Sequence, residues 1–436
     1  MPHDDLQKLL ELAPIRMGDL NRAAADAPRA ENAPALRDFA SDIEVTEEYQ
    51  LVFRLLQKRF PVVFVSGKAG TGKSTLISWL RSVLPGNMAV VAPTGVAALN
   101  VGGVTIHSFF RFPPHLIRPE DIKKILNRRL YKALDLLVVD EVSMVRADLM
   151  DGMDLFLRKN GRNPDLPFGG AQLLLVGDLF QLPPVIEKQE DEILASMEYA
   201  TPYFFSAHVL QECPVAPVEL SRIWRQADPA FAEMLNAVRE ARDLDTVLPL
   251  LNERVEPNSK HHDSSDADHI PQGVVTLTAT NAVADSINLA RLRKLPGRAA
   301  SFRGVLSGKF QVEESRLPSP ADLTLKPGAQ VMFTKNDEQK RWVNGSLGVV
   351  RDMGESNVVR VEMLTDRPGE IYDVSRVQWN SYRYEFNAES NRIEPVISGT
   401  YTQFPLMLAW AITIHKSQGK TLDRVRIDLG YGAFAP

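Results

Sequence analysis

Short runs of apolar residues alternate with amphipathic stretches along most of the chain. In the first half, runs that end in Gly or polar turns are Val62–Val65, Met88–Ala92, Leu136–Val139 and Leu173–Val176. Continuous apolar strands separated by helical stretches are typical of a parallel sheet that is covered on both faces. We therefore predict an α/β unit, preceded by a helix that begins after Thr46, a residue suited to the N-cap position.

A second set of apolar runs follows a charged stretch of low hydrophobicity near Glu253–Asp268. Its members are Val274–Leu277, Val331–Phe333 and Leu406–Ile414. These runs resume the strand rhythm of the first half, and they predict a second α/β unit with its own parallel sheet.

The pattern changes between Gly348 and Tyr401, where short apolar runs are separated by turns and no convincing helix is present. The four runs are Val349–Val350, Val358–Val361, Ile371–Val374 and Tyr382–Phe386. Such a pattern predicts a small insertion made only of strands. The expected organisation is an acidic, loosely ordered leader (1–41), a first lobe (42–225) with a small insertion near 111–132, a second lobe (226–348 and 405–436) and an all-β insertion (349–404).

Composition excludes several classes of protein. The chain has 436 residues, of which 44% are hydrophobic and 24% are charged, values close to those of average globular proteins. Its single cysteine, Cys213, excludes an internal disulfide framework and a Cys-rich zinc module. The run Leu406–Ile414 is too short to cross a bilayer, and the acidic start Met1–Asp5 differs from a basic signal peptide. We expect a cytoplasmic, nucleoid-associated protein.

Charge is distributed unevenly along the chain. The formal net charge is −5, but residues 1–48 hold eleven acids against five bases, which leaves the remaining chain nearly neutral. Within that remainder, Arg111–Lys132 contains seven Lys or Arg residues against Glu120 and Asp121. A local basic segment of this kind permits nucleic-acid binding, although it is weaker evidence than a basic chain overall.

The strongest motif is Gly67-Lys68-Ala69-Gly70-Thr71-Gly72-Lys73-Ser74, which fits the pattern G-x-x-x-x-G-K-[ST] between an apolar strand and a helix. Glycines let the backbone wrap a phosphate chain with its N–H groups inward, and the helix N-terminus adds partial positive charge. We expect Lys73 to reach the β- and γ-phosphates of ATP and the Ser74 hydroxyl to bind Mg²⁺. The expected nucleotide contacts are Gly67, Ala69, Gly70, Thr71, Gly72, Lys73, Ser74 and Thr75.

Two further motifs follow apolar strands. Leu136–Val139 leads into Asp140 and Glu141, which we assign to holding Mg²⁺ and to activating the attacking water, respectively. The run Leu173–Val176 leads into Asp178 and, three residues later, Gln181, which is placed to sense the γ-phosphate. In a parallel sheet all these residues reach the same edge, beside the glycine-rich loop.

With these motifs the chain resembles the Pif1-like DNA helicases of superfamily 1, the branch that also contains RecD and Dda. The resemblance runs from about Val45 to the C-terminus. Its further blocks are Ala92–Ala98, Gly102–Phe109, Asp140–Met144, Pro167–Gly170, Leu220–Gln226 and Ile414–Gly419.

The resemblance implies two RecA-like lobes with ATP and Mg²⁺ between them and single-stranded DNA across both. It also implies that the all-β insertion in the second lobe is SH3-like. It implies 5′-to-3′ translocation and unwinding of duplex DNA, sometimes of G-quadruplexes, by a monomer. It also implies an adenine contact for Gln50, a nucleotide contact for Gly419 and an arginine-finger role for Arg225. The DNA contacts that we carry over are Thr94, Gly95, His107, Ser108, Phe109, Thr280, Asn281, His415, Lys416 and Ser417.

Several of these positions have a simpler interpretation. Thr94, Gly95, His107 and Ser108 are also typical of N-caps and turns, and a residue such as Phe109 is more often a core residue than a platform for stacking a base. The basic segment Arg111–Lys132 is either a solvated helix face or, as the resemblance implies, an insertion at the junction of single-stranded and duplex DNA.

Family members continue with another strand and an Arg motif after a segment like Asp428–Gly430, whereas this chain ends at Pro436. We expect that the chain is truncated there. Three alternatives remain open: an ATP-gated clamp on single-stranded DNA with weak hydrolysis, a RecD-like subunit of a nuclease complex, and an RNA helicase.

Overall fold

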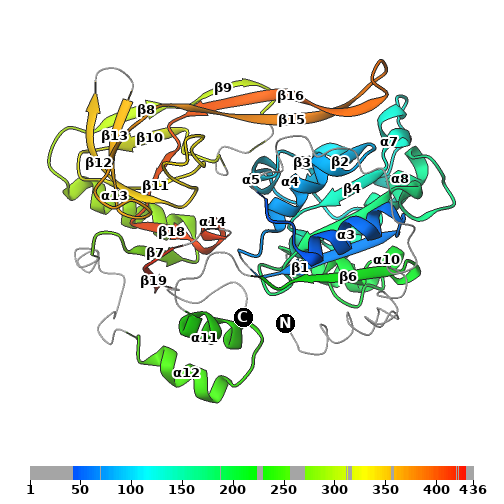
Figure 1. Cartoon of the computed structure of the whole chain (residues 1–436), viewed down its shortest axis with the longest axis horizontal. Helices are drawn as coiled ribbons and strands as arrows, with labels where there is room; N and C mark the ends of the chain where they lie inside the picture. Colours follow the sequence, from blue (N-terminus) through cyan, green and yellow to red (C-terminus); the bar gives the residue numbers. More distant parts are fainter. Residues whose placement is uncertain are drawn as a thin grey trace. The chain divides into compact units, whose positions relative to one another are not determined.

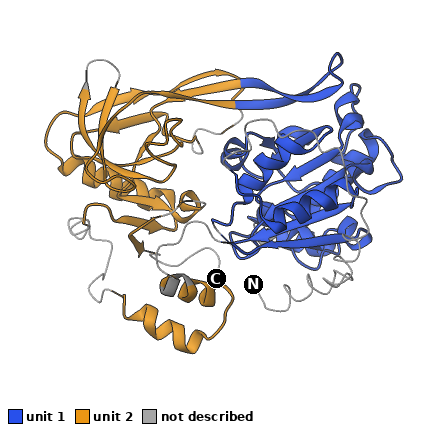
Figure 2. Cartoon of the chain, in the orientation of Figure 1, with its two compact units in different colours: residues 1–226, 381–398 blue, residues 227–380, 399–436 orange. Residues whose placement is uncertain are grey.

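The computed structural model describes residues 43–68, 70–186, 188–222, 229–255, 271–310, 312, 317–354, 358–418, 420 and 422–428. The chain divides into two compact units, shown in different colours in Figure 2. Unit 1 comprises residues 1–226 and 381–398, and unit 2 comprises residues 227–380 and 399–436. The predicted leader and the expected roles of Ala69, Arg225 and Gly419 lie outside the described residues.

Unit 1 is built around a parallel sheet (Figure 1). Its strands are β1 (Val62–Gly67), β2 (Met88–Ala92), β3 (Val104–Thr105), β4 (Leu136–Val139), β5 (Gln172–Gly177) and β6 (Val215–Leu220). Its α-helices are α3 (Glu47–Gln57), α4 (Lys73–Val83), α5 (Gly95–Asn100), α6 (Ile106–Phe110), α7 (Arg129–Ala133), α8 (Ala147–Asn160), α9 (Lys188–Ser196) and α10 (His208–Glu212). Short 3₁₀ helices are η2 (Pro119–Asp121), η3 (Val142–Met144), η4 (Pro167–Gly170) and η5 (Phe204–Ser206).

The six strands lie in the order β3-β2-β4-β5-β1-β6, and all neighbours are parallel. The order brings β5 between β4 and β1, so the carboxyl ends of these three strands are neighbours. Register is in step across them, with Val63 opposite Leu174 and Leu174 opposite Val138.

Both faces of this sheet are buried, as the apolar runs predicted. Alternate residues of β1 enter different cores: Val62 and Phe64 pack with α8, and Val63 and Val65 pack with α3 and α4. The strands β4 and β5 divide in the same way, since side chains alternate between the two faces of a strand. Helix α3 begins where the sequence predicted, because the Thr46 hydroxyl accepts a hydrogen bond from the N–H of Tyr49 at 3.3 Å.

Unit 2 combines α/β and all-β parts. Its helices are α11 (Pro229–Arg239), α12 (Leu244–Asn252), α13 (Asn281–Lys294) and α14 (Ile414–Ser417). Its strands are β7 (Val275–Thr278), β8 (Ala300–Arg303), β9 (Val305–Gly308), β10 (Asp322–Leu325), β11 (Gln330–Phe333), β12 (Leu347–Gly354), β13 (Val358–Met363), β14 (Ile371–Val374), β17 (Leu406–Leu408), β18 (Ala411–Thr413) and β19 (Val425–Asp428), together with parts of β15 (Val377–Asn387) and β16 (Arg392–Gln403).

The parallel sheet of unit 2 has the order β18-β7-β19, and the predicted all-β part forms an antiparallel sheet with the order β14-β13-β12-β11-β17. The α/β class with additional all-β sheets is thus confirmed. The structure differs from the prediction at two runs, because Val331–Phe333 and Leu406–Leu408 pair antiparallel with each other in the all-β sheet. Only the end of the predicted run Leu406–Ile414 joins the parallel sheet, as β18.

The far part of the hairpin formed by β15 and β16, residues 381–398, belongs to unit 1 rather than to unit 2. There the Tyr384 hydroxyl accepts a hydrogen bond from the N–H of Val90 at 3.0 Å. The Asn87 side chain accepts one from the N–H of Ile393 at 2.8 Å. Residues 381–398 of the predicted insertion 349–404 therefore pack on the first sheet, and the boundaries of the insertion stay a prediction.

The basic segment Arg111–Lys132 is packed against α8 by its apolar residues and its backbone. Ile117 and Ile122 are buried, and the N–H of Ile117 donates to the buried carboxylate of Asp148 at 2.7 Å. The N–H of Ile125 donates to Asn160 at 2.9 Å. Lys123, Lys124 and Arg129 are exposed, so the positive charge of this segment faces solvent.

No helix in the part of the chain that the structure describes is long and apolar enough to span a membrane.

Candidate functional site

The loop between β1 and α4 has the backbone that its glycines allow. Gly70 and Gly72 adopt φ values of 81° and 91°, in the left-handed region where a Cβ is strained. Gly67 is needed for space, since a Cβ there would lie 2.6 Å from the Thr71 hydroxyl oxygen. Gly72 is the N-cap of α4, so the loop ends at a helix N-terminus with N–H groups available to an anion.

Lys73 opens α4 with its ammonium turned back over the loop. Its Nζ donates to the carbonyl oxygens of Gly67 at 2.6 Å and Lys68 at 3.1 Å. The Thr71 hydroxyl donates to the same Lys68 carbonyl at 2.9 Å, and Thr71 is buried. The positive charge of Lys73 is therefore held directly over the backbone of the loop.

Tyr49 supports this loop from α3, a role that the sequence analysis missed. Its hydroxyl donates to the carbonyl of Gly72 at 2.6 Å, and its ring stacks on Trp79 of α4 with centroids 5.9 Å apart. Burial, with a further contribution from the Glu48 carboxylate, raises the pKa of Tyr49 to about 12, so it remains a neutral donor. Gln50, the predicted adenine contact, is the next residue on α3 and is exposed.

The carboxyl ends of β4 and β5 bring further polar groups to the edge of the sheet that carries the loop. Asp140 follows β4, is 6% exposed and precedes Glu141, whose φ of 51° is unusual for a residue with a side chain. Asp178 follows β5 and accepts a hydrogen bond from the Gln181 side chain at 3.1 Å. The pairing of β4 with β5 and of β5 with β1 thus brings these predicted residues to one edge.

The carboxyl groups of Asp140 and Glu141 interact electrostatically with Lys73 of the loop. Burial, with the adjacent Glu141, raises the pKa of Asp140 to about 7, while Lys73 acts in the opposite direction. Burial also raises the pKa of Glu141, again opposed by Lys73. A second positive charge at this edge would therefore favour the ionised form of both groups.

The donor set fits Mg²⁺ bound together with a nucleotide. Ser74 is exposed at the first turn of α4, which follows β1, and Asp140 supplies a carboxylate at the end of β4, on the other side of β5. Mg²⁺ prefers oxygen ligands and is usually held by one or two protein groups plus phosphate oxygens. The described residues contain no group of three or more His, Cys, Asp or Glu side chains that would hold a metal ion alone.

Strand β6 ends beside the start of α3. The Ser221 hydroxyl donates to Glu48 at 2.8 Å, and the Arg222 guanidinium pairs with Glu44. This is the last described part of the block that contains Arg225, whose role stays a prediction.

Threonines cap helices at four strand ends, two in each unit. In unit 1, Thr94 caps α5 after β2 and Thr105 caps α6 after β3. In unit 2, Thr280 caps α13 after β7 and Thr413 caps α14 after β18. In every case the hydroxyl accepts a hydrogen bond from the backbone N–H of the third residue of the helix, as an N-cap does.

These caps position most of the predicted DNA contacts. Gly95 and Asn281 open α5 and α13, and His107 and Ser108 lie in the first turn of α6. His415, Lys416 and Ser417 form α14, with His415 and Lys416 exposed. Burial, with nearby Arg146, lowers the pKa of His107, so it is neutral at pH 7. The contacts themselves stay predictions.

Phe109 requires a correction, because its ring lies in the core of unit 1. It is 6% exposed and packs edge-to-face against Phe110, Tyr131 and Tyr384, with centroids 4.9 to 5.8 Å apart. Stacking on a base needs an accessible ring face. We therefore remove Phe109 from the set of DNA contacts.

Truncation of this ring tests the packing role. Phe109→Ala is expected to lower the free energy of unfolding by about 3–5 kcal/mol, because it leaves a cavity at the junction of α6, α7 and the hairpin. Leu126→Ala, at a fully exposed side chain, is the control and should change stability by at most about 0.5 kcal/mol. Urea unfolding followed by circular dichroism measures both, and equal midpoints for the two variants would contradict the assignment.

Comparison with known proteins gives one family. Residues 44–243 match the model of the PIF1-like helicase family. The chain is 32% identical over 469 residues to the ATP-dependent DNA helicase PIF1 of Emericella nidulans, covering 92% of this chain and 58% of that protein. It is 32% identical over 399 residues to ATP-dependent DNA helicase Pif1 of Bdellovibrio bacteriovorus, covering 89% and 82%, respectively. The chain thus spans little more than half the length of the first of these relatives.

Solved structures agree. A crystal structure of Bacteroides sp Pif1 in complex with ADP-AlF4 is 38% identical and superposes with a TM-score of 0.80, covering 89% of this chain and 87% of that one. Bacteroides Pif1 bound to single-stranded DNA is 37% identical with a TM-score of 0.57, covering 90% and 87%.

Proposed function

The chain belongs to the Pif1-like helicase family, and on that premise we propose that it is an ATP-dependent DNA helicase. The observation that carries the proposal is the gathering of a phosphate-binding loop, Lys73, the pair Asp140 and Glu141, and Gln181 at one edge of one sheet. A relative of known structure binds ADP-AlF4, and the same relative binds single-stranded DNA.

In this proposal the loop residues bind the phosphates and the chain's own side chains drive hydrolysis. Glu141 takes a proton from water as the water oxygen attacks the γ-phosphorus and the bond to the β,γ-bridging oxygen breaks. Lys73 stabilises the negative charge on the departing phosphate oxygens. Gln181, held by Asp178, senses the γ-phosphate, and Arg225 acts as arginine finger. When Mg²⁺ is bound it neutralises phosphate charge, and Ser74 and Asp140 are the residues that would hold it.

We assign DNA binding to the capped helix starts. Small polar side chains and N–H groups at helix N-termini suit phosphate oxygens, and neither reads sequence. Each unit thus has two such helix starts that would bind DNA phosphates: those capped by Thr94 and Thr105 in unit 1, and those capped by Thr280 and Thr413 in unit 2. We propose that a monomer moves 5′-to-3′ along one strand and unwinds forked duplexes, and that G-quadruplexes are further substrates.

The test is ATP turnover with and without single-stranded DNA, followed by strand separation on forks that have only a 5′ or only a 3′ loading tail. We expect turnover to be strongly stimulated by DNA and unwinding to require the 5′ tail. DNA binding without stimulation of ATP turnover would instead favour the alternative of an ATP-gated clamp on single-stranded DNA. Unwinding from the 3′ tail would contradict the proposed polarity alone.

Lys416 gives a separate test of the DNA contacts. It is exposed in α14, and no hydrogen bond or ion pair of its side chain is found among the described residues. Lys416→Gln is expected to weaken single-stranded DNA binding and to reduce the slope of log K against log salt by about 0.7, the value for one phosphate contact. Fluorescence anisotropy over a salt series measures both.

The matched control is Arg298→Gln. Arg298 is exposed beyond the C-terminal end of α13, the helix whose N-terminus Thr280 caps, so the same charge is removed at the far end of that helix. An unchanged slope in Lys416→Gln, or an equal change in Arg298→Gln, would count against α14 as a phosphate contact.

A further inference from the structure

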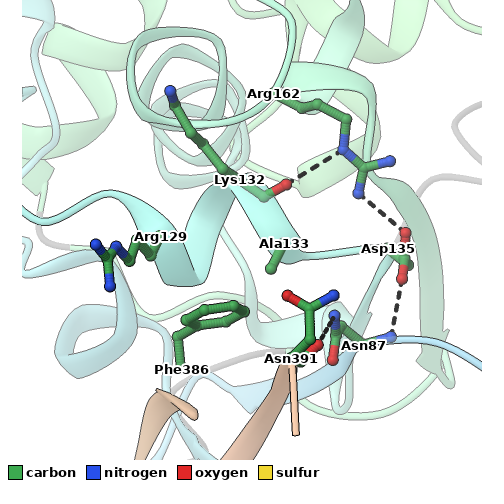
Figure 3. A pocket seen from close by; sticks show the side chains of 8 residues that line it. All are labelled: Asn87, Arg129, Lys132, Ala133, Asp135, Arg162, Phe386 and Asn391. Atoms are coloured by element: carbon green, nitrogen blue, oxygen red, sulfur yellow. Dashed lines mark hydrogen bonds and ion pairs between the residues drawn. The ribbon is translucent and has the colours of Figure 1, made fainter. Parts of the chain in front are cut away.

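A pocket of about 550 Å³ lies in unit 1 between α7 and the tip of the hairpin (Figure 3). Arg129, Lys132 and Ala133 line it from α7, and Phe386 and Asn391 line it from the hairpin. This volume is in the range of ligand-binding pockets.

The pocket is at the opposite edge of the sheet from the phosphate-binding loop. Asn87 and Asp135, which also line it, immediately precede β2 and β4, whereas the loop and Asp140 follow their strands. Strands of four to six residues separate the two edges by about 13–20 Å. The capped helix starts of unit 1 lie at the loop edge as well, so the pocket is part of neither the nucleotide site nor the proposed DNA track.

Hydrogen bonds build this pocket from both sides. The Asn87 side chain donates to the carbonyl of Asn391 at 3.4 Å and accepts from the N–H of Ile393 at 2.8 Å, which fixes the hairpin tip. Asp135 accepts from the N–H of Asn87 and from Arg162, both at 2.9 Å, which fixes the floor. Tyr384 of the hairpin also packs on Phe109 beneath α7.

The groups left to face a ligand are of three kinds. Asp135 is paired with Arg162 and lies 3.7 Å from Arg59, so its charge is compensated. Among the described residues, the side chains of Arg129, Lys132 and Asn391 have no hydrogen bond or ion pair. The Phe386 ring is half-buried against the core and presents its remaining surface to the pocket. Two cations, one amide and one aromatic surface are thus available.

We propose that this pocket binds one nucleotide of a second strand of nucleic acid, with its phosphate on Arg129 and Lys132 and its base against Phe386 and Asn391. A planar base stacks on an aromatic ring, an amide hydrogen-bonds a base edge, and guanidinium or ammonium groups bind phosphate. The second strand is the one displaced from the fork, an assignment that rests on the proposed helicase function.

Exposure favours a strand over a free nucleotide. Arg129, Lys132, Arg162 and Asn391 are all exposed, so the pocket is open on one side. Pockets for small ligands usually bury most of the ligand surface, whereas a unit within a polymer gains affinity from its neighbours.

The test compares the whole chain, without ATP, on a fork that has a single-stranded displaced arm and on the same DNA lacking that arm. Arg129→Gln combined with Lys132→Gln should weaken binding of the armed fork by about tenfold and leave the armless DNA unchanged. Lys123→Gln combined with Lys124→Gln removes the same charge from the same segment outside the pocket and should have a clearly smaller effect. Since no turnover is measured, failure of the helicase activity would not affect the result.

Photocrosslinking gives a second, independent readout. A 5-iodouracil in the displaced arm should crosslink to the peptide that contains Phe386, and mass spectrometry identifies the site. The proposal is overturned if that crosslink is missing from a fully bound complex, if the two charge pairs weaken binding equally, or if the pocket variant weakens armless DNA as much. Complete loss of the crosslink in the presence of millimolar deoxynucleoside monophosphate, with the fork still bound, would assign the pocket to a free nucleotide instead.

Discussion

Lys73→Met is expected to abolish ATP hydrolysis while the protein stays folded. The Lys73 ammonium is held over the loop by two carbonyl oxygens, and it opposes the rise that burial causes in the pKa of both Asp140 and Glu141, so it acts as a positive charge on the carboxyl pair. Loss of one such preorganised charge from a phosphoryl-transfer site costs about 10²–10³ in turnover. Methionine is an unbranched side chain one atom shorter than lysine, and it has a similar helix propensity.

The measurement is phosphate release at saturating ATP with single-stranded DNA present. Lys58→Met is the control, because Lys58 is exposed at the end of α3, outside the loop. We expect control turnover within about twofold of the original chain, as for most surface substitutions. Turnover in Lys73→Met at a tenth or more of the original would mean that another cation neutralises the phosphates.

The site could be predicted from the sequence because each of its parts is local. The loop, the pair Asp140 and Glu141, and Gln181 each follow their own apolar strand within a few residues. In a parallel sheet the carboxyl ends of strands share one edge, so recognising the strands is enough to gather the residues. The family resemblance, which rested on these same blocks, is confirmed by the family model and the relatives.

The contacts that sequence reasoning missed join residues far apart in the chain. Tyr49 reaches Gly72 across 23 residues, and Tyr384 reaches Val90 across 294. Neither has a spacing that a local pattern exposes. Both are tyrosines whose hydroxyls satisfy backbone groups.

The pairing of strands in unit 2 could not be predicted from the sequence either. Val331–Phe333 is a continuous apolar run in either a parallel or an antiparallel sheet if both faces are covered, so hydrophobicity alone does not fix its neighbours. The structure pairs it with β12 on one side and with β17 on the other. The boundaries between the second lobe and the all-β insertion therefore stay a prediction.

The capped threonines show that two interpretations of one residue are compatible. Thr94 and Thr280 are N-caps, as the simpler interpretation held. An N-cap occupies the hydroxyl with one backbone donor, and the other N–H groups of the first turn stay available to a phosphate. The structural role thus supports the proposed binding role.

Glu141→Gln is expected to leave ATP binding intact and to lower turnover by about 10²–10⁴, the contribution typical of a general base. Glu141 is held in a left-handed backbone conformation between β4 and η3, at the edge that carries the loop. Strained backbone of this kind persists where surrounding structure holds it, and it is frequent at active sites. Gln keeps the shape and polarity of the side chain but does not accept the proton.

Two comparisons make the assignment specific. Glu120→Gln neutralises an exposed acid in η2 and should leave turnover within about twofold. Asp140→Asn should instead weaken binding of ATP in the presence of Mg²⁺, because Asp140 is the proposed metal ligand. Equilibrium binding of a fluorescent ATP analogue therefore separates the two carboxylates. The group that activates water is the one whose loss leaves ATP binding intact. If Glu141→Gln weakens ATP binding, or if Asp140→Asn binds ATP tightly without turnover, the roles of metal ligand and general base would have to be exchanged between the two residues.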